Sequence, residues 1–565
     1  MAEPKISGGS TLKIESNKTF NSMLNLLNVY IPAYKDLSAY IDPTRGIFNG
    51  DRTKIGKMID HKTLVDSHAS FAKRTTSSGM QMGMTDQSRP WFKLTLEDIL
   101  LTNVPGMREW VDEVTKRMLA VMNKSNIYKV FQQCYDEITQ FGTGCFIILE
   151  DFEDVIRGKS FTAGEYMLAT DNKGRVNRFA REFEMTIGQM AREFGYESLS
   201  ESSKAYYNTN QMDVSIKIRH LIEPNNTRIP GYQDFANMAY RSLYWEAGTN
   251  TGDQFLAKRG YKSFRVIAPR WDAPTTDTVL GYGPGWYAIG DIKELQATEK
   301  DALLAQQKLG DPPVLQDSSV VGHLNKLPGG ITKVDGAVPN SGVRPAYQVD
   351  PHLEAFQAKI ENLHQKIDKH FFADIFRMIS NLEGQPNITA FQIAQMKQEQ
   401  MMMLGPILHS LNDEMHSRAI DIIAEIMLDA GLIPPPPMAL PEGTELKVQF
   451  LSVLAQAQKL MGVQQIEMTL TSLGNLSTIY PGITDNVDID EAAVEIMEGN
   501  SVPGKIIKSK EQIAADREQR QVQQNQMMAL EAGVQVADAA SKLGKTPGKG
   551  SGSVLNDLGN TLARR

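Results

Sequence analysis

The sequence predicts a predominantly helical α+β fold in which long amphipathic helices accompany an antiparallel sheet. Apolar residues recur every three or four positions over several long segments, as they do on one face of a helix. Between Cys145 and about Asp272 the period changes to two, which indicates strands. The chain has 565 residues, of which 41% are hydrophobic, so it is long and apolar enough to bury several cores.

Composition and charge exclude several classes of protein. No segment approaches the ~18 uninterrupted apolar residues of a membrane helix, and the first residues lack the apolar run of a signal peptide, so we expect a cytoplasmic product with no membrane partner. Cys134 and Cys145 cannot form a disulfide framework. A formal net charge of −8 argues against tight binding of nucleic acid, but it suits a surface past which DNA slides.

The first quarter of the chain is predicted to be mainly helical. Residues 1–18 are polar and expected to be mobile, and a helix follows from Thr19 with a break at Pro32. Residues 64–78 and 110–124 read as further helices. YKVFQQCYDEITQFG continues the pattern and is closed by glycines, whereas QMGMTDQSRPWFKL is predicted to be a loop.

Alternating segments then predict the sheet. FIILED, EYMLAT, RVNRFAREFEM, VSIKI, YRSLYWEA and FRVIAPRW are the strand candidates. EYMLAT and RVNRFAREFEM flank DNKG, a hairpin-turn composition. MTIGQMAREFG is a short helix that Thr186 caps and Gly195 ends.

Two long helices come next, separated by a Pro/Gly-rich excursion. The glycines Gly281, Gly283 and Gly285 are predicted to form a structural turn that directs the first of these helices. That helix is expected to start at Gly290, with Asp291 as its N-cap, and to end at Gly310.

The second helix is predicted to run unbroken from Pro351 to about Ser380, roughly 40 Å at ~1.5 Å per residue. It carries one continuous apolar stripe, and such a stripe needs partners along its whole length. One copy of the chain offers few partners, so we expect neighbouring subunits to supply them. The expected contact residues are Phe356, Ile360, Leu363, Ile367 and Phe371.

The remaining segments are a loop, a helix and a weakly patterned C-terminal region. A third helix is expected from Thr389, with Gln392 completing a capping box, through a kink at Gly405 and Pro406 to Gly431. LKVQFLSVLAQAQKL then predicts a strand and a helix, and residues 505–545 a Gln-rich helix before a flexible tail. The loop that precedes the third helix consists of Asn381, Leu382, Glu383, Gly384, Gln385, Pro386, Asn387 and Ile388.

Catalytic and metal-binding patterns are missing from the sequence. The two GK[ST] triplets, at 158–160 and 544–546, lack the first glycine of a phosphate loop. The acidic run TDNVDIDE lacks the central glycine of a calcium loop. His364 and His370 lack metal-ligand spacing and are expected to pack or lie on the surface. We therefore expect no enzymatic activity, no metal site and no cofactor.

Several longer stretches resemble the head-to-tail connector, or portal, proteins of short-tailed bacteriophages. The stretches that carry the resemblance are SHASFAKRTTSSGMQMGMTDQSRPWFKL, DNKGRVNRFAREFEMT, GYGPGWYAIGDIKELQ, DPPVL and FLSVLAQAQK, in that order along the chain. Together they span most of the sequence up to about residue 500.

The resemblance implies a ring of twelve subunits at one capsid vertex, through which DNA is packaged and ejected. The regions it implies are a flexible arm (1–18), a wing of helices and antiparallel sheet (19–290), stem helices (291–310 and 350–380), a β-rich clip (311–349), a tunnel loop facing the channel (381–388), a long kinked wing or crown helix (389–432), a returning segment (433–504), a helical crown or barrel (505–545) and a flexible tail (546–565).

The partners that the resemblance implies belong to a virion. They are other copies of the chain, major capsid and scaffolding proteins, the terminase packaging motor, tail adaptor proteins, internal core or ejection proteins, and double-stranded DNA bound without sequence specificity. Two alternatives remain open from the residues alone. One is another structural virion protein of the tail or internal core, and the other is a DNA-packaging enzyme.

Overall fold

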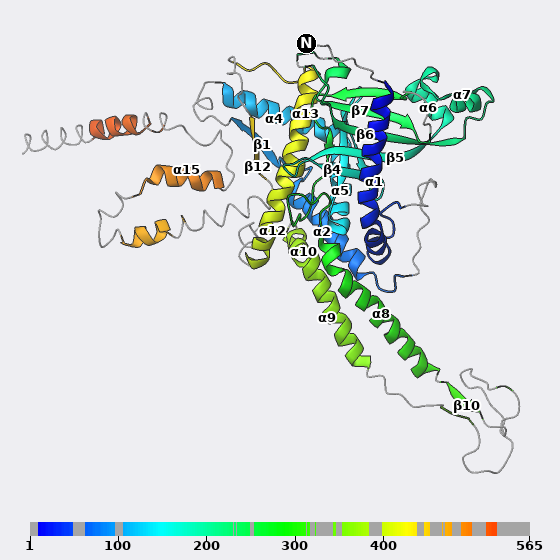
Figure 1. The fold of residues 1–565 in the computed structure, drawn as a ribbon. Helices are drawn as coiled ribbons and strands as arrows, with labels where there is room; N and C mark the ends of the chain where they lie inside the picture. Colours follow the sequence, from blue (N-terminus) through cyan, green and yellow to red (C-terminus); the bar gives the residue numbers. More distant parts are fainter. Residues whose placement is uncertain are drawn as a thin grey trace, which may run out of the picture. The chain divides into compact units, whose positions relative to one another are not determined.

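The computed structural model of the chain contains two compact units, Met1–Met461 and Gly462–Arg565. The residues that the structure describes are 9–48, 63–96, 106–229, 231–232, 234–248, 254–311, 313–316, 323, 343–345, 353–382, 398–437, 446–451, 466, 469–476, 487–499, 513 and 516–527. The fold is a mixture of helices and antiparallel sheets, as the sequence predicts (Figure 1).

The largest sheet has five antiparallel strands in the order β4-β5-β6-β7-β8. The strands are β4 (Tyr166–Thr170), β5 (Val176–Thr186), β6 (Ser215–Pro224), β7 (Tyr240–Glu246) and β8 (Ala257–Tyr261). The predicted DNKG hairpin joins β4 to β5, and Gly174 takes a positive φ of 75° there. β8 is not among the strands that the sequence predicts.

A three-stranded antiparallel sheet, β3-β2-β9, lies at the centre of unit 1. It consists of β2 (Cys145–Asp151), β3 (Val155–Phe161) and β9 (Val266–Ile267). Successive side chains of a strand point to opposite faces. Phe146 and Ile148 of β2 accordingly belong to one hydrophobic core, and Cys145 and Ile147 to another, so this sheet separates the two large cores.

Four helices pack around these sheets: α1 (Gly9–Tyr40), α2 (His68–Met84), α4 (Met107–Lys124) and α5 (Ile127–Phe141). α1 starts well before the predicted Thr19, and the break expected at Pro32 is wrong. Pro32 lies on the exposed side of α1, while Leu27, Ile31 and Tyr34 are buried on the other. Burial of these apolar residues before and after Pro32 outweighs the free energy lost because proline removes a backbone hydrogen bond.

The predicted loop around Trp91 is also wrong. Its first residues complete α2, and Phe92 begins β1 (Phe92–Leu96), which pairs antiparallel with β12 (Leu446–Phe450). Trp91 and Phe92 are fully buried. The local sequence does not predict β1, because its partner strand β12 is more than 300 residues away along the chain. The helix predicted after β12 lies outside the described residues.

Two short helices cover one end of the five-stranded sheet. They are α6 (Ile187–Phe194) and α7 (Glu201–Asn208), and they enclose a small core with Ile218 of β6. The predicted cap of α6 is confirmed, since the Thr186 hydroxyl accepts from the Gln189 N–H and the Gln189 side chain bonds back to Thr186.

The second long helix is broken where the sequence predicts continuity. α9 (Leu353–Phe371) ends at Phe372, which has a positive φ of 56°, and α10 (Ala373–Leu382) follows. A phenylalanine in the left-handed region of backbone conformation is strained. The ring of Phe372 packs against Trp271. The break lets Phe371 enter one large core and Phe376 the other.

The third long helix runs through Gly405 and Pro406 without ending. It consists of α12 (Gln398–Leu411), a π-helical turn (Asn412–Ser417) and α13 (Arg418–Asp429). The predicted capping box at Thr389 lies outside the described residues. In unit 2, α15 (Ile489–Gly499) is helical, and so are residues 516–527 inside the predicted Gln-rich helix. Among the helices that the structure describes, none combines the length and hydropathy needed to span a bilayer.

Candidate functional site

The candidate site is the pair of helices α8 (Pro284–Gly310) and α9, which we call the stem. They lie side by side and extend away from the sheets of unit 1 (Figure 1). Between their far ends, β10 (Val314–Gln316) and β11 (Val343–Pro345) form a two-stranded antiparallel ladder. Apart from this ladder, Asp311, Pro313 and His323, the excursion 311–349 lies outside the described residues.

The three glycines before and at the start of α8 lie against the backbone at the end of α5. A Cβ on Gly281 would lie 2.7 Å from the Gly142 carbonyl oxygen. Gly283 and Gly285 approach the Ile138 and Gln140 carbonyls in the same way, each closer than 3.0 Å to a built Cβ. Side chains do not fit at these three positions, so the glycines let α8 leave directly from the end of α5.

α8 begins earlier than the sequence predicts. Pro284 occupies its first position, where a missing N–H costs nothing, and Gly283 is the N-cap. Trp286 fixes the first turn, because its Nε1–H donates to the Phe141 carbonyl at 2.8 Å. The predicted N-cap, Asp291, lies inside α8 instead, where its carboxylate meets His370 of α9 at 3.2 Å.

The inner half of the stem is held together by buried apolar side chains. Ile292 and Leu295 of α8 share a core with Leu363, Ile367 and Phe371 of α9, and all five are fully buried. The last three were predicted to contact neighbouring subunits. The structure places them inside the chain's own core, against α8 and α2, and leaves Phe356 and Ile360 half-buried.

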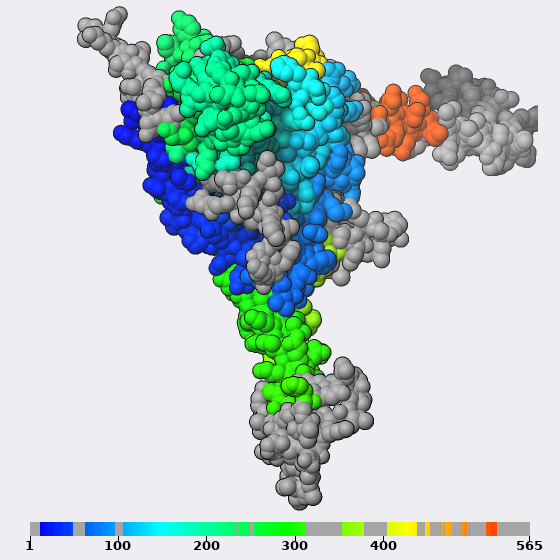
Figure 2. Space-filling model, turned by 90° about the vertical axis from the view of Figure 1, so that its right-hand side faces the viewer, coloured from blue at the N-terminus to red at the C-terminus, as the bar shows by residue number. Residues whose placement is uncertain are grey.

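The outer half of the stem has no such core. Beyond Thr298, α8 has no buried residue, and α9 has none before Leu363. Leu303, Leu304 and Leu309 are 49%, 43% and 55% exposed. Figure 2 shows this part of α8, in green, projecting beyond the blue N-terminal helices. The sequence pattern does not single out these three leucines, because they are not spaced three or four positions apart.

Charged pairs link the stem helices along their exposed sides. The ammonium of Lys359 lies 2.9 Å from Glu294, and that of Lys366 lies 3.9 Å from Asp291. Such exposed pairs contribute little to stability, typically ~0–1 kcal/mol each. The apolar core therefore supplies most of the stabilisation between α8 and α9.

A polar junction fastens the stem to the segment before α2. The side-chain carbonyl of Gln296 accepts from the backbone N–H groups of Val65 and Asp66 at 2.7 and 2.9 Å, and its amide donates to the Asp66 carbonyl at 2.8 Å. Gln296 is buried. The backbone of Asp66 is therefore held on both its donor and its acceptor side.

Two histidines stack at this junction. The rings of His68 and His364 lie 4.0 Å apart and nearly parallel. His68 bonds to Asp368 at 3.0 Å, and Arg377 forms two bonds of 2.9 Å with the same carboxylate. Burial lowers the pKa of His68, but the hydrogen bond and charge of Asp368 outweigh burial and the pKa is raised.

The predicted tunnel loop is only partly visible. Asn381 and Leu382 are the last residues of α10, and residues 383–388 lie outside the described residues.

The structure describes one of the two phosphate-loop-like triplets. Gly158, Lys159 and Ser160 belong to strand β3, whereas residues 544–546 lie outside the described residues.

Comparisons with known protein sequences identify the family of the chain. Residues 15–507 match the sequence profile of a family described as bacteriophage head to tail connecting protein. The chain is 34% identical over 513 residues to the probable portal protein of Bordetella phage BPP-1, covering 90% of this chain and 91% of that protein. It is 34% identical over 512 residues to the portal protein of Salmonella phage epsilon15, with the same coverage. The chain therefore belongs to the family of bacteriophage head-to-tail connecting, or portal, proteins.

Proposed function

We propose that this portal chain assembles into a closed ring whose stem helices surround a channel for double-stranded DNA at one capsid vertex. The observation that supports the ring concerns the outer half of the stem. There, three leucines of α8 are exposed, and α8 has no buried residue beyond Thr298. Exposed apolar side chains are stabilised by burial against a partner, and a head-to-tail contact that closes on itself produces a ring. Twelve copies is the number that the family implies.

Charge supports passage of DNA rather than static binding. α8 carries four acidic and three basic side chains, and α9 carries three of each, so the stem is close to neutral. Each copy adds a formal charge of −8 to the ring. Tight binding to phosphates would call for a strongly basic surface.

The β10–β11 ladder supports a docking role for the excursion 311–349. Its antiparallel pairing brings the two ends of the excursion together at the tip of the stem, as expected of a separate projecting element. We assign to this clip the docking of the terminase packaging motor and later of the tail adaptor. Contacts with capsid, scaffolding and internal core proteins belong to the wing and to the C-terminal region.

Electron microscopy of purified variants tests the ring. Leu303→Glu and Leu304→Glu place a charge where an apolar side chain meets a neighbouring copy, and burying an unpaired charge costs several kcal/mol. We expect wild-type rings with a central hole and mostly single subunits for both variants, with unchanged far-UV circular dichroism. Gln306→Glu adds the same charge to the same helix without removing an apolar contact, and its rings should persist. Intact rings in both leucine variants would contradict the proposed contact.

A further inference from the structure

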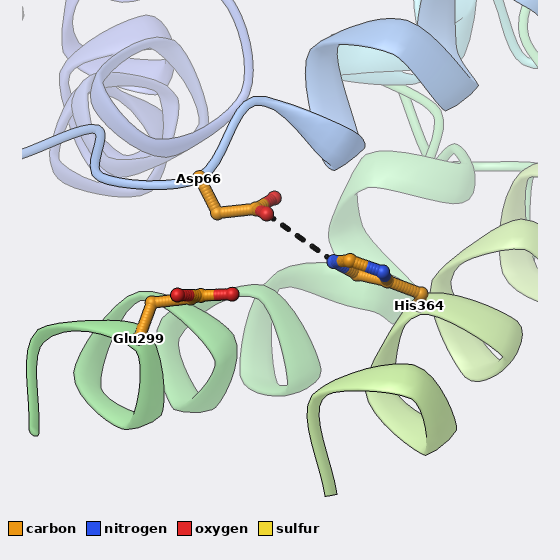
Figure 3. Close-up of side chains that lie close together, drawn as sticks. All are labelled: Asp66, Glu299 and His364. Atoms are coloured by element: carbon orange, nitrogen blue, oxygen red, sulfur yellow. Dashed lines mark hydrogen bonds and ion pairs between the residues drawn. The ribbon is translucent and has the colours of Figure 1, made fainter. Parts of the chain in front are cut away.

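Asp66, Glu299 and His364 come together at the junction between the stem and the segment before α2. One ligand atom from each lies within 4.8 Å of the other two. The three residues belong to three separate segments: the stretch before α2, the helix α8 and the helix α9. Figure 3 shows their side chains converging on one small region. We propose that they bind a divalent transition-metal ion, with Zn²⁺ as the best fit, which fastens the stem to the rest of unit 1.

The spacing of two ligand atoms already suits such an ion. Asp66 Oδ2 lies 3.2 Å from His364 Nε2. Two ligands on a tetrahedral zinc, each ~2.0–2.1 Å from the metal, are about 3.3 Å apart. The ion can therefore replace the hydrogen bond between them while both side chains stay in place. The carboxylate of Glu299 is half-exposed and has an oxygen within 4.8 Å of both other ligand atoms, so it must move closer to fill the third position.

Neighbouring contacts fix two of the three ligands in advance. Gln296 holds the backbone of Asp66, and the His68 N–H donates to Asp66 Oδ1 at 2.7 Å, so Oδ2 is directed at His364. His364 is held flat against the ring of His68, which Asp368 in turn anchors. Such support around a metal site orients the ligands and raises affinity.

The donor set selects the class of metal. One imidazole nitrogen with two carboxylate oxygens suits zinc and its first-row neighbours, whereas Mg²⁺ and Ca²⁺ prefer oxygen ligands alone. Among the residues that the structure describes, no lysine or arginine forms an ion pair with Asp66 or Glu299. A divalent cation would balance the two carboxylates. His364 was predicted from its sequence spacing to pack or lie on the surface, because Asp66 and Glu299 are far from it along the chain.

Metal binding to the full-length protein tests the site directly. After treatment with a chelator and desalting, we expect the protein to take up one Zn²⁺ per chain in isothermal titration calorimetry, and no Mg²⁺ under the same conditions. Co²⁺ should give the visible absorption of a four-coordinate site. Asp66→Asn, Glu299→Gln and His364→Gln should each lower zinc affinity at least tenfold and abolish the cobalt band.

A matched variant separates the site from general surface charge. Asp301 lies exposed on α8, two positions after Glu299, so Asp301→Asn makes the same charge change outside the cluster and should bind zinc as the wild type does. Far-UV circular dichroism without metal should be the same for all variants, because the side-chain carbonyl that Asp66→Asn introduces can still accept from the His68 N–H. The proposal is overturned if no stoichiometric zinc binds, or if Glu299→Gln and Asp66→Asn bind it as tightly as Asp301→Asn.

Discussion

At the scale of single residues, His416 lies fully buried where the π-helical turn Asn412–Ser417 meets α5. Its Nε2 lies 2.7 Å from the hydroxyl of Tyr135, and its Nδ1 lies 2.8 Å from the side-chain oxygen of Asn412. A neutral imidazole satisfies both contacts, since Nδ1–H donates to Asn412 and Nε2 accepts from Tyr135. Burial lowers the pKa of His416 to about 3, so this neutral form persists in the folded chain.

This histidine makes stability depend on pH. Below about pH 6.5 the unfolded chain binds a proton at His416 and the folded chain does not, so stability falls as the pH is lowered. Between pH 7.5 and 5.5 the expected loss is about 1.4 kcal/mol. His416→Gln should lose that much less than the wild type in urea denaturation, whereas His409→Gln, which changes an exposed histidine of α12, should follow the wild type. Equal pH dependence in all three proteins would contradict a neutral His416.

At the scale of elements, the start of α8 depends on the absence of side chains. Gly283→Ala would place a methyl group against the Ile138 carbonyl, and no flexible neighbour can yield there. We expect this substitution to lower the melting temperature and to expose the stem to limited proteolysis. Gly290→Ala is the matched control, because nothing lies within 4 Å of its Cβ and alanine favours a helix interior by roughly 0.5–1 kcal/mol. A Gly283→Ala protein as stable as Gly290→Ala would show that the close approach is not needed.

The sequence predicted elements well where local pattern and local structure coincide. The apolar spacing of α5, the cap of α6 and the DNKG hairpin all depend on residues close together in the chain. The sequence did not predict the elements that depend on contacts with residues far away along the chain. β1 exists because β12 pairs with it, α9 ends at Phe372 because two cores must be filled, and α1 continues through Pro32 because burial holds it.

The same distinction between local pattern and distant contacts applies to the candidate site. The glycine turn and the apolar stripe of α9 could be read from local sequence, but which side chains face inward could not. Leu363, Ile367 and Phe371 are buried because α8 and α2 lie against them. Asp66, Glu299 and His364 are far apart in the sequence, so no spacing rule could bring them together.

At the scale of the whole molecule, the proposed channel allows a test on DNA. The loop predicted at residues 381–388, of which 383–388 lie outside the described residues, is expected to be mobile and to face the channel. Glu383 is its only charged side chain. Deleting residues 383–386 should leave rings intact and lower the amount of DNA retained per particle after packaging in vitro. Glu383→Lys should raise the affinity of the ring for DNA in a salt-sensitive manner, because a cation near phosphates gains from counterion release.

The control for this experiment is a charge change far from the stem. Glu197 lies exposed beside α6, so Glu197→Lys alters the net charge by the same amount without adding a cation to the loop. Its DNA affinity and retention should match the wild type. Normal retention by the deletion, together with no salt-sensitive gain for Glu383→Lys, would place the loop away from DNA.

The pairing of β1 with β12 also governs when the subunit can fold during its synthesis. Thr95 and Lys447, which face each other in this ladder, are 352 positions apart. A ribosome that adds roughly 5–20 residues per second needs about 20–70 s to make the intervening chain. Throughout that interval the edge of β1 has no partner and Trp91 no complete core. A nascent chain therefore cannot present a finished subunit to its neighbours, and closure of the proposed ring would have to wait until nearly 450 residues have left the ribosome.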